Sequence, residues 1–447
     1  MSRRDDVMRS FNLHRDETDA RVAAGIEQNR KGDFTVTVKD AAGRPVPGAK
    51  VQIKQKTHAF LHGANIFMLD ELETAEKNRQ YRDAFHRVCN QATLPFYWRD
   101  LEPEQGKPRF AKDSPRIYRR PAPDLCLEYC DEWGVTPKAH CLTYFNFTPD
   151  WVNIGDVADQ KKKLEERYRT CAERYADRIH GWEVINELLG VPRYMEANAF
   201  YADDEVLEWN FRLAEKYFPH NELIVNEATH VWGWAGDAQG GTFSYNRSPY
   251  YNMIERGLKN GARIDTVGMQ FHVFKKPEDE RACHQSLYDP RMLFMVMDRY
   301  AKLGKPLQIT EITIPAYTDD KEDEAIQADL LEQLYSIWFS HGAVETITYW
   351  NLVDGYAAFA PQGDMTHGEN VFRAGLLRFD MSPKPAYERL YSLFEERWHT
   401  ETQATTDANG CLTFRGFFGG YDLQVEGKTY RIETAAGKDN ESEIVLM

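Results

Sequence analysis

Eight short apolar stretches, separated by longer helical segments, constrain this chain more than any other feature. Each stretch has the length and the β-branched or aromatic content of a strand. They are "AFLHGANIF", "QATLPF", "TPKAHCL", "GWEVINE", "ELIVNE", "DTVGMQFH", "PLQITEIT" and "ETITYWN". Between them, apolar residues recur at helical spacing, as near 157–178, where one face carries Leu164, Tyr168, Cys171, Tyr175 and Ile179. Eight strands that alternate with helices predict an α/β fold, a (β/α)8 TIM barrel.

The two ends of the chain differ from the middle because their polar and apolar residues alternate with a period of two. Residues 33–55 predict two strands around the turn "AAGRPVPG", and residues 403–447 predict several short strands. Neither end is long enough to close a core alone, so we expect both termini to form one small β-sandwich-like domain. The predicted organisation is a helical or irregular segment 1–31, strands 32–58, the barrel 59–398 and completing strands 399–447.

Aromatic residues in the C-terminal strands bear on what this small domain does. Phe414, Phe417, Phe418 and Tyr421 alternate as core residues do. This pattern favours a structural cap on the barrel over a ligand-binding module.

Charge and composition exclude some classes of partner. The formal net charge of −15 disfavours nucleic acid, and no apolar run reaches the roughly 18 residues that a membrane helix needs. The start, "MSRRDDVMRSFNLHRDE", has no hydrophobic stretch behind its arginines and is not typical of a signal peptide. We therefore expect a cytoplasmic protein without a membrane partner.

The cysteines support the same location. There are seven, an odd number without repeating spacing, which is a poor disulfide framework. Cys126 and Cys130 are one helical turn apart, but no matching His/Cys pair follows, so reduced thiols explain them better than a metal site. Reduced thiols are typical of the cytoplasm.

Polar or aromatic residues stand at or near the C-terminal ends of seven predicted strands. Barrel active sites are built from that rim. Solvent exposure alone is a weak explanation for so many strand ends that converge on one mouth. The residues are Asn65, His140, Glu187, Glu227, His272, Glu311 and Trp350.

Two of these strand ends carry carboxylates in a pattern that suits glycoside hydrolysis. Glu187 follows the fourth strand and Glu311 the seventh. In a retaining enzyme one carboxylate is the nucleophile, the other is the general acid and then base, and the two lie about 5–5.5 Å apart. Aromatic rings suit a sugar ligand because pyranose C–H faces pack on them, and the tryptophan candidates are Trp182, Trp232, Trp234 and Trp350.

A metal site is the competing hypothesis. His140, His272, Glu187 and Glu311 have the side chains of a barrel metallohydrolase. Such sites often begin with an H-x-H pair on one strand, whereas "KAHCLTY" and "GMQFHVF" each offer one histidine. We therefore expect no metal and no cofactor.

Four segments carry a resemblance to a known family. "GWEVINE", "GMQFH", "QITEITI" and "HCLTYFNFTPDW" resemble, in the same order, the motifs of glycoside hydrolase family 10, the retaining endo-β-1,4-xylanase family. The resemblance covers about residues 59–398. It implies a retaining hydrolase that cleaves β-1,4-xylosidic linkages in an oligosaccharide or polysaccharide.

The resemblance also implies roles for matched residues. Glu187 would be the acid/base and Glu311 the nucleophile, with His272 orienting Glu311 and Gln270 on the same strand face. Asn186 would bond the sugar 2-hydroxyl. The remaining implied sugar contacts are His140, Trp350, Trp98 and Tyr144.

The chain departs from the family pattern mainly at the residues that bind the sugar units next to the cleaved one. In the second strand the family's Glu-Asn pair and lysine are replaced by "LPFY", residues 94–97. Tyr144-Phe145 stand where the family usually has Trp-His, and the second family tryptophan becomes Ala358 or is displaced to Phe359. "TEIT" replaces the usual Thr-Glu-Leu-Asp. The mechanism is therefore better supported than the substrate.

Three functional hypotheses remain open from the sequence. The first is xylosidic hydrolysis, with a narrowed glycone side. The second is the same mechanism on another short or decorated β-glycoside. The third is a carbohydrate-binding barrel without catalysis, which the presence of both Glu187 and Glu311 disfavours. Endo or exo action and the oligomeric state are left open.

Overall fold

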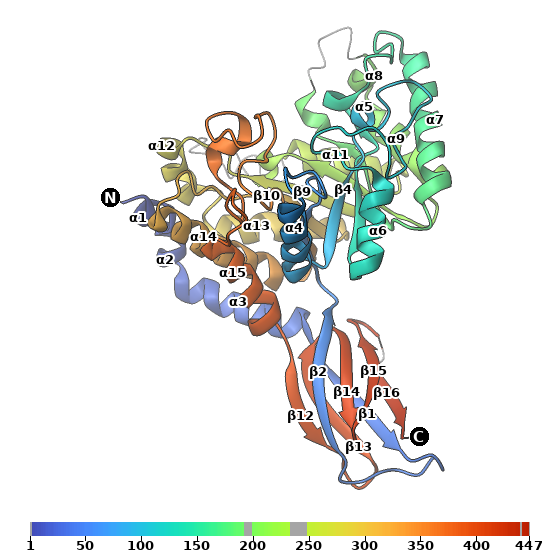
Figure 1. Cartoon of the computed structure of the whole chain (residues 1–447), viewed down its shortest axis with the longest axis vertical. Coiled ribbons are helices and arrows are strands. Elements are labelled where there is room, and N and C mark those ends of the chain that lie inside the picture. Colours follow the sequence, from blue (N-terminus) through green and yellow to red (C-terminus); the bar gives the residue numbers. More distant parts are fainter. Residues whose placement is uncertain (1, 192–198, 233–247, 439, 447) are drawn as a thin grey trace.

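The computed structural model of the chain describes residues 2–191, 199–232, 248–438 and 440–446. A large barrel with surrounding helices stands on a small β-domain, and the N-terminal helices lie along one side of the barrel (Figure 1). Both chain termini contribute to these peripheral parts, so the middle of the chain builds the barrel alone.

Eight parallel strands form a closed sheet, which confirms the predicted TIM barrel. Closure follows from β5, which pairs with β4 on one side and with β7 on the other. The two-residue strand β6 (Thr143–Tyr144) extends the pairing along β7. The eight strands are β3 (Leu61–Asn65), β4 (Gln91–Pro95), β5 (Thr136–His140), β7 (Gly181–Asn186), β8 (Glu222–Glu227), β9 (Thr266–His272), β10 (Leu307–Thr313) and β11 (Val344–Tyr349).

Helices follow the strands around the outside of the barrel. Their ends have local causes: the Asp156 side chain accepts hydrogen bonds from two backbone N–H groups at the start of α7, and Gly134, at φ 65°, ends α6. The helices of the barrel region are α4 (Ala75–Val88), α5 (Trp98–Leu101), α6 (Pro123–Trp133), α7 (Val157–Tyr175), α8 (Ala199–Ala202), α9 (Val206–Tyr217), α11 (Pro249–Lys259), α12 (Pro277–Glu280), α13 (Pro290–Tyr300), α14 (Lys321–Ser340) and α15 (Pro385–Ser392).

The barrel interior is tightly packed and partly polar. A Cβ atom at Gly63 would lie 1.9 Å from the carbonyl oxygen of Gln91, so only glycine fits there between β3 and β4. Inside, Thr348 donates to Gln91 Oε1 at 3.1 Å, and Gln91 donates to Thr93 at 3.2 Å. These polar side chains inside the barrel therefore satisfy one another by hydrogen bonds.

The small β-domain consists of two sheets, each built from both ends of the chain. One sheet has the order β13-β1-β16, and the other β12-β2-β14-β15. Thus β1 and β2, adjacent in sequence, lie in different sheets. Phe414, Phe417 and Tyr421 are buried, as the pattern predicts, and Phe418 is partly buried against the core of this domain. The strands are β1 (Lys31–Lys39), β2 (Lys50–His58), β12 (Glu401–Thr405), β13 (Cys411–Phe417), β14 (Gly419–Val425), β15 (Lys428–Thr434) and β16 (Glu441–Val445).

The segment before β1 forms three helices that bind to the barrel helices. They are α1 (Arg3–Val7), α2 (Arg9–Leu13) and α3 (Arg15–Asn29), and α3 packs on α14. Arg3 forms an ion pair with Glu280 at 2.7 Å, and Val7 and Phe11 are fully buried. Charge pairing and apolar burial together fix this segment to the barrel.

Within the described residues no helix is both long and apolar enough to cross a bilayer. All seven cysteines are free thiols, and six of them, including Cys126 and Cys130, are buried.

The junction between barrel and β-domain makes stability depend on pH through two buried histidines. His58 Nε2 lies 3.1 Å from the Trp398 carbonyl oxygen, and the His62 ring stacks on Phe394. Burial lowers the pKa of each imidazole to about 3, against about 6.5 in an unfolded chain. As pH falls from 6.5 towards 3, the unfolded chain gains protons that the folded state does not bind. Stability should fall by about 1.4 kcal/mol per pH unit for each histidine.

The measurement is the free energy of unfolding in urea between pH 7 and pH 4. His62→Gln should reduce the pH slope by about one proton relative to the unmodified chain. His220→Gln, at an exposed histidine before β8, is the control and should leave the slope unchanged. An identical slope in all three proteins would contradict the assignment to buried histidines.

Candidate active site

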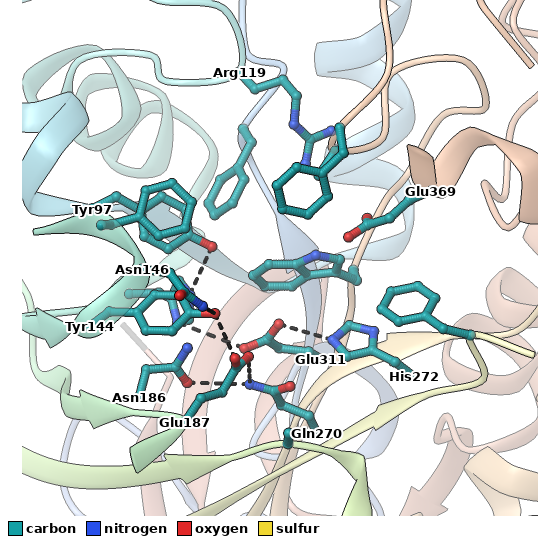
Figure 2. A pocket seen from close by; sticks show the side chains of 18 of the residues that line it. Tyr97, Arg119, Tyr144, Asn146, Asn186, Glu187, Gln270, His272, Glu311 and Glu369 are labelled. Atoms are coloured by element: carbon teal, nitrogen blue, oxygen red, sulfur yellow. Dashed lines mark hydrogen bonds and ion pairs between the residues drawn. The ribbon is translucent and has the colours of Figure 1, made fainter. Parts of the chain in front are cut away.

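A cavity of about 800 Å³ opens at the C-terminal ends of the barrel strands. It is lined by all the predicted site residues except Trp98 (Figure 2). Of the seven polar or aromatic strand ends, Asn65 and Glu227 do not line it. Glu227 is fully buried and accepts hydrogen bonds from the backbone N–H groups of Leu189 and Ala228, both at 3.0 Å. Its carboxyl group therefore supports the turn after β7 and does not face the cavity.

Glu187 stands immediately after β7, in a backbone conformation that side chains other than glycine seldom adopt. Its φ is 52°, which costs on the order of 1 kcal/mol and turns the side chain into the cavity. Tyr144 Oη–H donates to Glu187 Oε2 at 2.6 Å, and Gln270 Nε2–H donates to Oε1 at 3.0 Å. Both oxygens therefore have a donor, as Figure 2 shows.

Tyr144 contributes a contact that the resemblance does not supply. Its hydroxyl accepts from Asn146 Nδ2 at 3.1 Å while it donates to Glu187. Burial and the negative charge of Glu187 raise the pKa of Tyr144, so the hydroxyl keeps its proton and remains a donor. The tyrosine at this departure from the family pattern therefore fixes the position of one of the two carboxylates.

Glu311 lies in β10 and faces the same cavity. It is 3% exposed, and its oxygens accept from Asn226 Nδ2 at 3.0 Å and from His272 Nε2 at 3.1 Å. Burial raises the pKa of Glu311, the charges of Glu183 and Glu187 add to the rise, and His140 opposes it. The two hydrogen bonds favour the ionised carboxylate, because an ionised carboxylate accepts more strongly than a carboxylic acid.

His272 is a neutral donor to Glu311. Burial lowers the pKa of its imidazole to about 4. Thr313 Oγ1 lies 2.8 Å from Nδ1, so the hydroxyl proton satisfies Nδ1 and Nε2–H is left to donate to Glu311. The ring also stacks on Phe274 with centroids 4.6 Å apart. His272 thus orients Glu311 without adding a charge.

Replacing His272 by alanine should lower kcat about 10-fold or more, with little loss of stability, since a rim residue contributes little to core packing. His272→Gln is the matched variant because its amide keeps an N–H donor, and it should recover part of the lost rate. The measurements are kcat on an aryl β-xyloside and the unfolding midpoint. An alanine variant that unfolds would show that the histidine supports the core instead.

A buried ionic network lies beneath Glu311. Lys138 Nζ is 2.6 Å from Glu183, and His140 Nδ1 bonds the other Glu183 oxygen. Burial by itself raises the pKa of Glu183, but Lys138 and His140 outweigh it and hold the pKa at about 2. Burial by itself lowers the pKa of His140, but Glu183 reverses the effect and raises it. The network keeps an ordered set of charges directly below the nucleophile candidate.

His140 has little hydrogen-bonding capacity left for a sugar, because protein groups contact both of its ring nitrogens. Its Nδ1 is bonded to Glu183 and its Nε2 lies 3.0 Å from the Tyr97 hydroxyl. The resemblance implies direct sugar binding by His140, whereas in this chain protein groups take both ring nitrogens. Tyr97, from the divergent second strand, takes the place beside it and lines the cavity.

Among the described residues, His140, Glu183 and Glu311 have ligand atoms within 4.8 Å of one another, the spacing of a possible metal site. Lys138 already pairs with Glu183, and a divalent cation there would lie beside that ammonium group. The donor set therefore fits a metal ion poorly. His272 and Glu187, the other two ligands of the metal hypothesis, are not part of this group.

The predicted aromatic contacts have different outcomes. Trp350 lines the cavity and packs edge-on against Phe67, with centroids 5.3 Å apart. Trp98 does not line the cavity: it is buried, and its Nε1–H donates to Glu102 at 3.0 Å. Trp182 and Trp232 are fully buried core residues, and Trp234 lies outside the described residues.

Asn226 is the main site residue for which the sequence reasoning gave no role. It bonds Glu311 and also donates to Asn186 Oδ1 at 2.9 Å. Asn186 and Asn226 are register partners on β7 and β8, and each precedes a glutamate. The repeated Asn-Glu at two adjacent strand ends was the available signal.

Comparisons with known proteins agree with this architecture. Residues 59–393 match the family profile of Glycosyl hydrolase family 10. The crystal structure of native xylanase 10B from Thermotoga maritima superposes with a TM-score of 0.56 at 23% identity, covering 76% of this chain and 96% of that one. The xylanase 10B of Thermotoga petrophila RKU-1 in complex with xylobiose gives 0.57 at 22% identity, with 76% and 95% covered. At this identity the structures establish the fold.

Relatives by sequence are distant. A Beta-1,4-xylanase of Dictyoglomus thermophilum is 25% identical over 286 residues, covering 59% of this chain and 73% of the relative. The Anti-sigma-I factor RsgI6 of Acetivibrio thermocellus is 24% identical over 404 residues, covering 90% of this chain. This chain spans 45% of the length of that relative.

Proposed function

The chain belongs to glycosyl hydrolase family 10, and from that premise we propose that it is a retaining hydrolase of β-1,4-xylosidic linkages in oligosaccharides. The observation that carries the proposal is the pair Glu187 and Glu311. Glu187 follows β7 and Glu311 lies in β10; both face one cavity, and each is held by two hydrogen-bond donors. Xylanase names among the relatives support the linkage.

Double displacement assigns one step to each carboxylate. Glu311 attacks the anomeric carbon while Glu187 donates a proton to the leaving oxygen, so a sugar–Glu311 ester forms as the glycosidic bond breaks. Glu187 then removes a proton from water, which attacks the same carbon and releases Glu311. Hydrogen bonds from Asn226 and His272 hold the Glu311 carboxylate in position. Hydrogen bonds from Tyr144 and Gln270 hold the Glu187 carboxylate in position.

The stereochemistry of the first product tests the mechanism. With a β-xyloside as substrate, proton NMR recorded during the first minutes should show the β-anomer before mutarotation. An α-anomer as first product would indicate inversion and would contradict the double displacement.

The divergent second strand supports a preference for short substrates. Tyr97, the last residue of the segment that replaces the family's sugar-binding polar residues, is held by His140 and stacks on Phe147 with ring centroids 4.0 Å apart. We expect kcat/KM to change little from xylobiose to xylohexaose and polymeric xylan to be a poor substrate, because subsites that are absent add no binding energy in the transition state. A steep rise with chain length would show an open multi-subsite cleft.

A second candidate function is carbohydrate binding without turnover. Turnover of an aryl β-xyloside that is lost in the Glu311→Ala variant would exclude it. Turnover that survives EDTA would likewise exclude the metal hypothesis.

A further inference from the structure

Arginines gather on the cavity wall opposite the Glu187 carboxylate. Arg99, Arg119 and Arg120 all line the cavity. Figure 2 shows Arg119 across the cavity from Glu187 and Gln270, on the side where Tyr97 lies. The proposed reaction uses none of these three cations, so their presence needs a separate explanation.

Two of the three arginines have an acidic partner within the protein. Arg120 Nε lies 2.6 Å from Asp100 Oδ2, and Arg99 Nε lies 3.6 Å from Asp100 Oδ1. The Arg120 guanidinium also stacks over the Tyr97 ring, 4.3 Å from its centroid. One carboxylate is thus shared between these two cations.

Arg119 differs because its partners are neutral. Its side chain donates to Asn351 Oδ1 at 3.2 and 3.3 Å and to the Tyr356 carbonyl oxygen. The residue is 6% exposed, and within the described part of the chain no carboxylate forms an ion pair with it. The charge of Glu369 acts on Arg119 without touching it. A buried cation that no carboxylate contacts directly keeps much of its desolvation cost unless a ligand pairs with it.

The nearest acid is held away from Arg119 by an amide. Glu369 also lines the cavity, and its Oε2 accepts from Asn351 Nδ2 at 3.3 Å. Asn351 therefore bonds Arg119 through its oxygen and Glu369 through its nitrogen. This arrangement keeps the two charges from pairing directly and leaves the guanidinium available at the cavity wall.

The backbone supports the same interpretation. Arg119 has a φ of 63°, in the left-handed region that costs on the order of 1 kcal/mol for a side chain other than glycine. Strained residues of this kind cluster at ligand contacts. The aromatic rings of Phe67, Tyr97 and Trp350 line the same cavity and offer a surface for a pyranose ring.

We propose that Arg119 binds the carboxylate of a uronic acid unit that lies next to the sugar being cleaved. The preferred substrate is then an acidic β-linked oligosaccharide. This proposal rests on the proposed function for the position of the scissile bond. It names the class of substrate for that site.

This proposal is tested by measuring ligand binding to a variant that cannot hydrolyse the ligand. In the Glu311→Gln variant, calorimetry compares cellobiouronic acid with cellobiose, which differ only in the carboxylate of the non-reducing sugar. The acid should bind about 10-fold or more tightly, because a charge-assisted bond to a buried guanidinium is strong. Cellobiose 6'-sulfate is the third ligand and distinguishes a sulfate ester from a uronate.

Substitutions of Arg119 then test whether this residue causes the preference for the acidic sugar. Arg119→Gln in the same background should bring the acid-to-neutral ratio close to one, whereas Arg119→Lys should keep part of it. Arg116→Gln is the matched control, on the same loop, 61% exposed at its side chain and outside the cavity, and it should keep the full ratio.

Equal affinity for acid and neutral sugar, absence of binding, or a preference for the sulfate alone would each overturn the proposal. A purely structural role of Arg119 would change both affinities together and leave their ratio intact. The anomer measured by NMR on a neutral aryl xyloside tests the proposed function separately, so either claim can fail alone.

Discussion

Replacing Glu311 by alanine should lower kcat by about 10⁴-fold or more, because the residue whose carboxylate forms the covalent intermediate is removed. The effect should appear on every substrate, since no leaving group avoids the need for a nucleophile. The measurement is kcat on an aryl β-xyloside and on xylobiose. Folding should be retained, which near-ultraviolet circular dichroism checks.

A matched control is Glu345→Gln. Glu345 lies at the opposite end of the barrel, in β11, and burial together with the neighbouring Glu222 carboxylate raises its pKa. Glutamine therefore imitates its protonated form, and kcat should be unchanged. Loss of activity in both variants would point to a general effect of altering buried carboxyl groups.

Azide separates the two roles. In Glu311→Ala, azide enters the space left by the carboxylate, attacks from that face, and should give no β-product. In a variant lacking Glu187, azide attacks the glycosyl-enzyme from the other face and should give a β-glycosyl azide. The reverse pattern would mean that the roles of Glu187 and Glu311 are exchanged.

Replacing Glu187 by alanine should cost about 10²–10⁴-fold in kcat on xylobiose, whose leaving group needs a proton. The loss in the first step should be small on 2,4-dinitrophenyl β-xyloside, whose leaving group departs unprotonated. A plot of rate against leaving-group pKa measures this. A uniform loss across leaving groups would contradict the acid/base assignment.

The same substitution removes an acceptor from two side chains. Tyr144 and Gln270 both donate to Glu187 and would be left unpaired. Glu187→Gln keeps the shape but presents an amide to two donors, so it is the matched variant for stability. Both variants should lose the proton donor equally, whatever their stability.

Local patterns were sufficient for the fold. Seven of the barrel strands lie within the apolar stretches of the sequence, and the eighth, β11, begins one residue before its stretch, at Val344, because buried parallel strands need continuous apolar runs with a fixed length. The strand-end position of Glu187 and Glu311 also follows from that pattern, since a barrel brings all strand ends to one mouth.

Side-chain direction was not available from the sequence. Glu227 ends its strand as Glu187 does, yet it turns away to bond Leu189 and Ala228. Trp98 fits the family segment but packs inward on Glu102. The rotamer at each of these positions depends on neighbours that come from other strands and loops.

Periodicity and strand-end chemistry are therefore what the sequence alone determined: a TIM barrel, a β-domain from both termini, and two carboxylates at one mouth. The tertiary structure alone decided that Tyr97 and Glu183 take both nitrogens of His140 and that Asn226 bonds Glu311. It also decided that Arg119 lines the cavity and donates to Asn351 and not, among the residues described, to a carboxylate. The physical reason is the separation along the sequence between the residues that interact. A strand or helix is set by residues a few positions apart, whereas these contacts join side chains tens to hundreds of positions apart and exist only after the barrel closes.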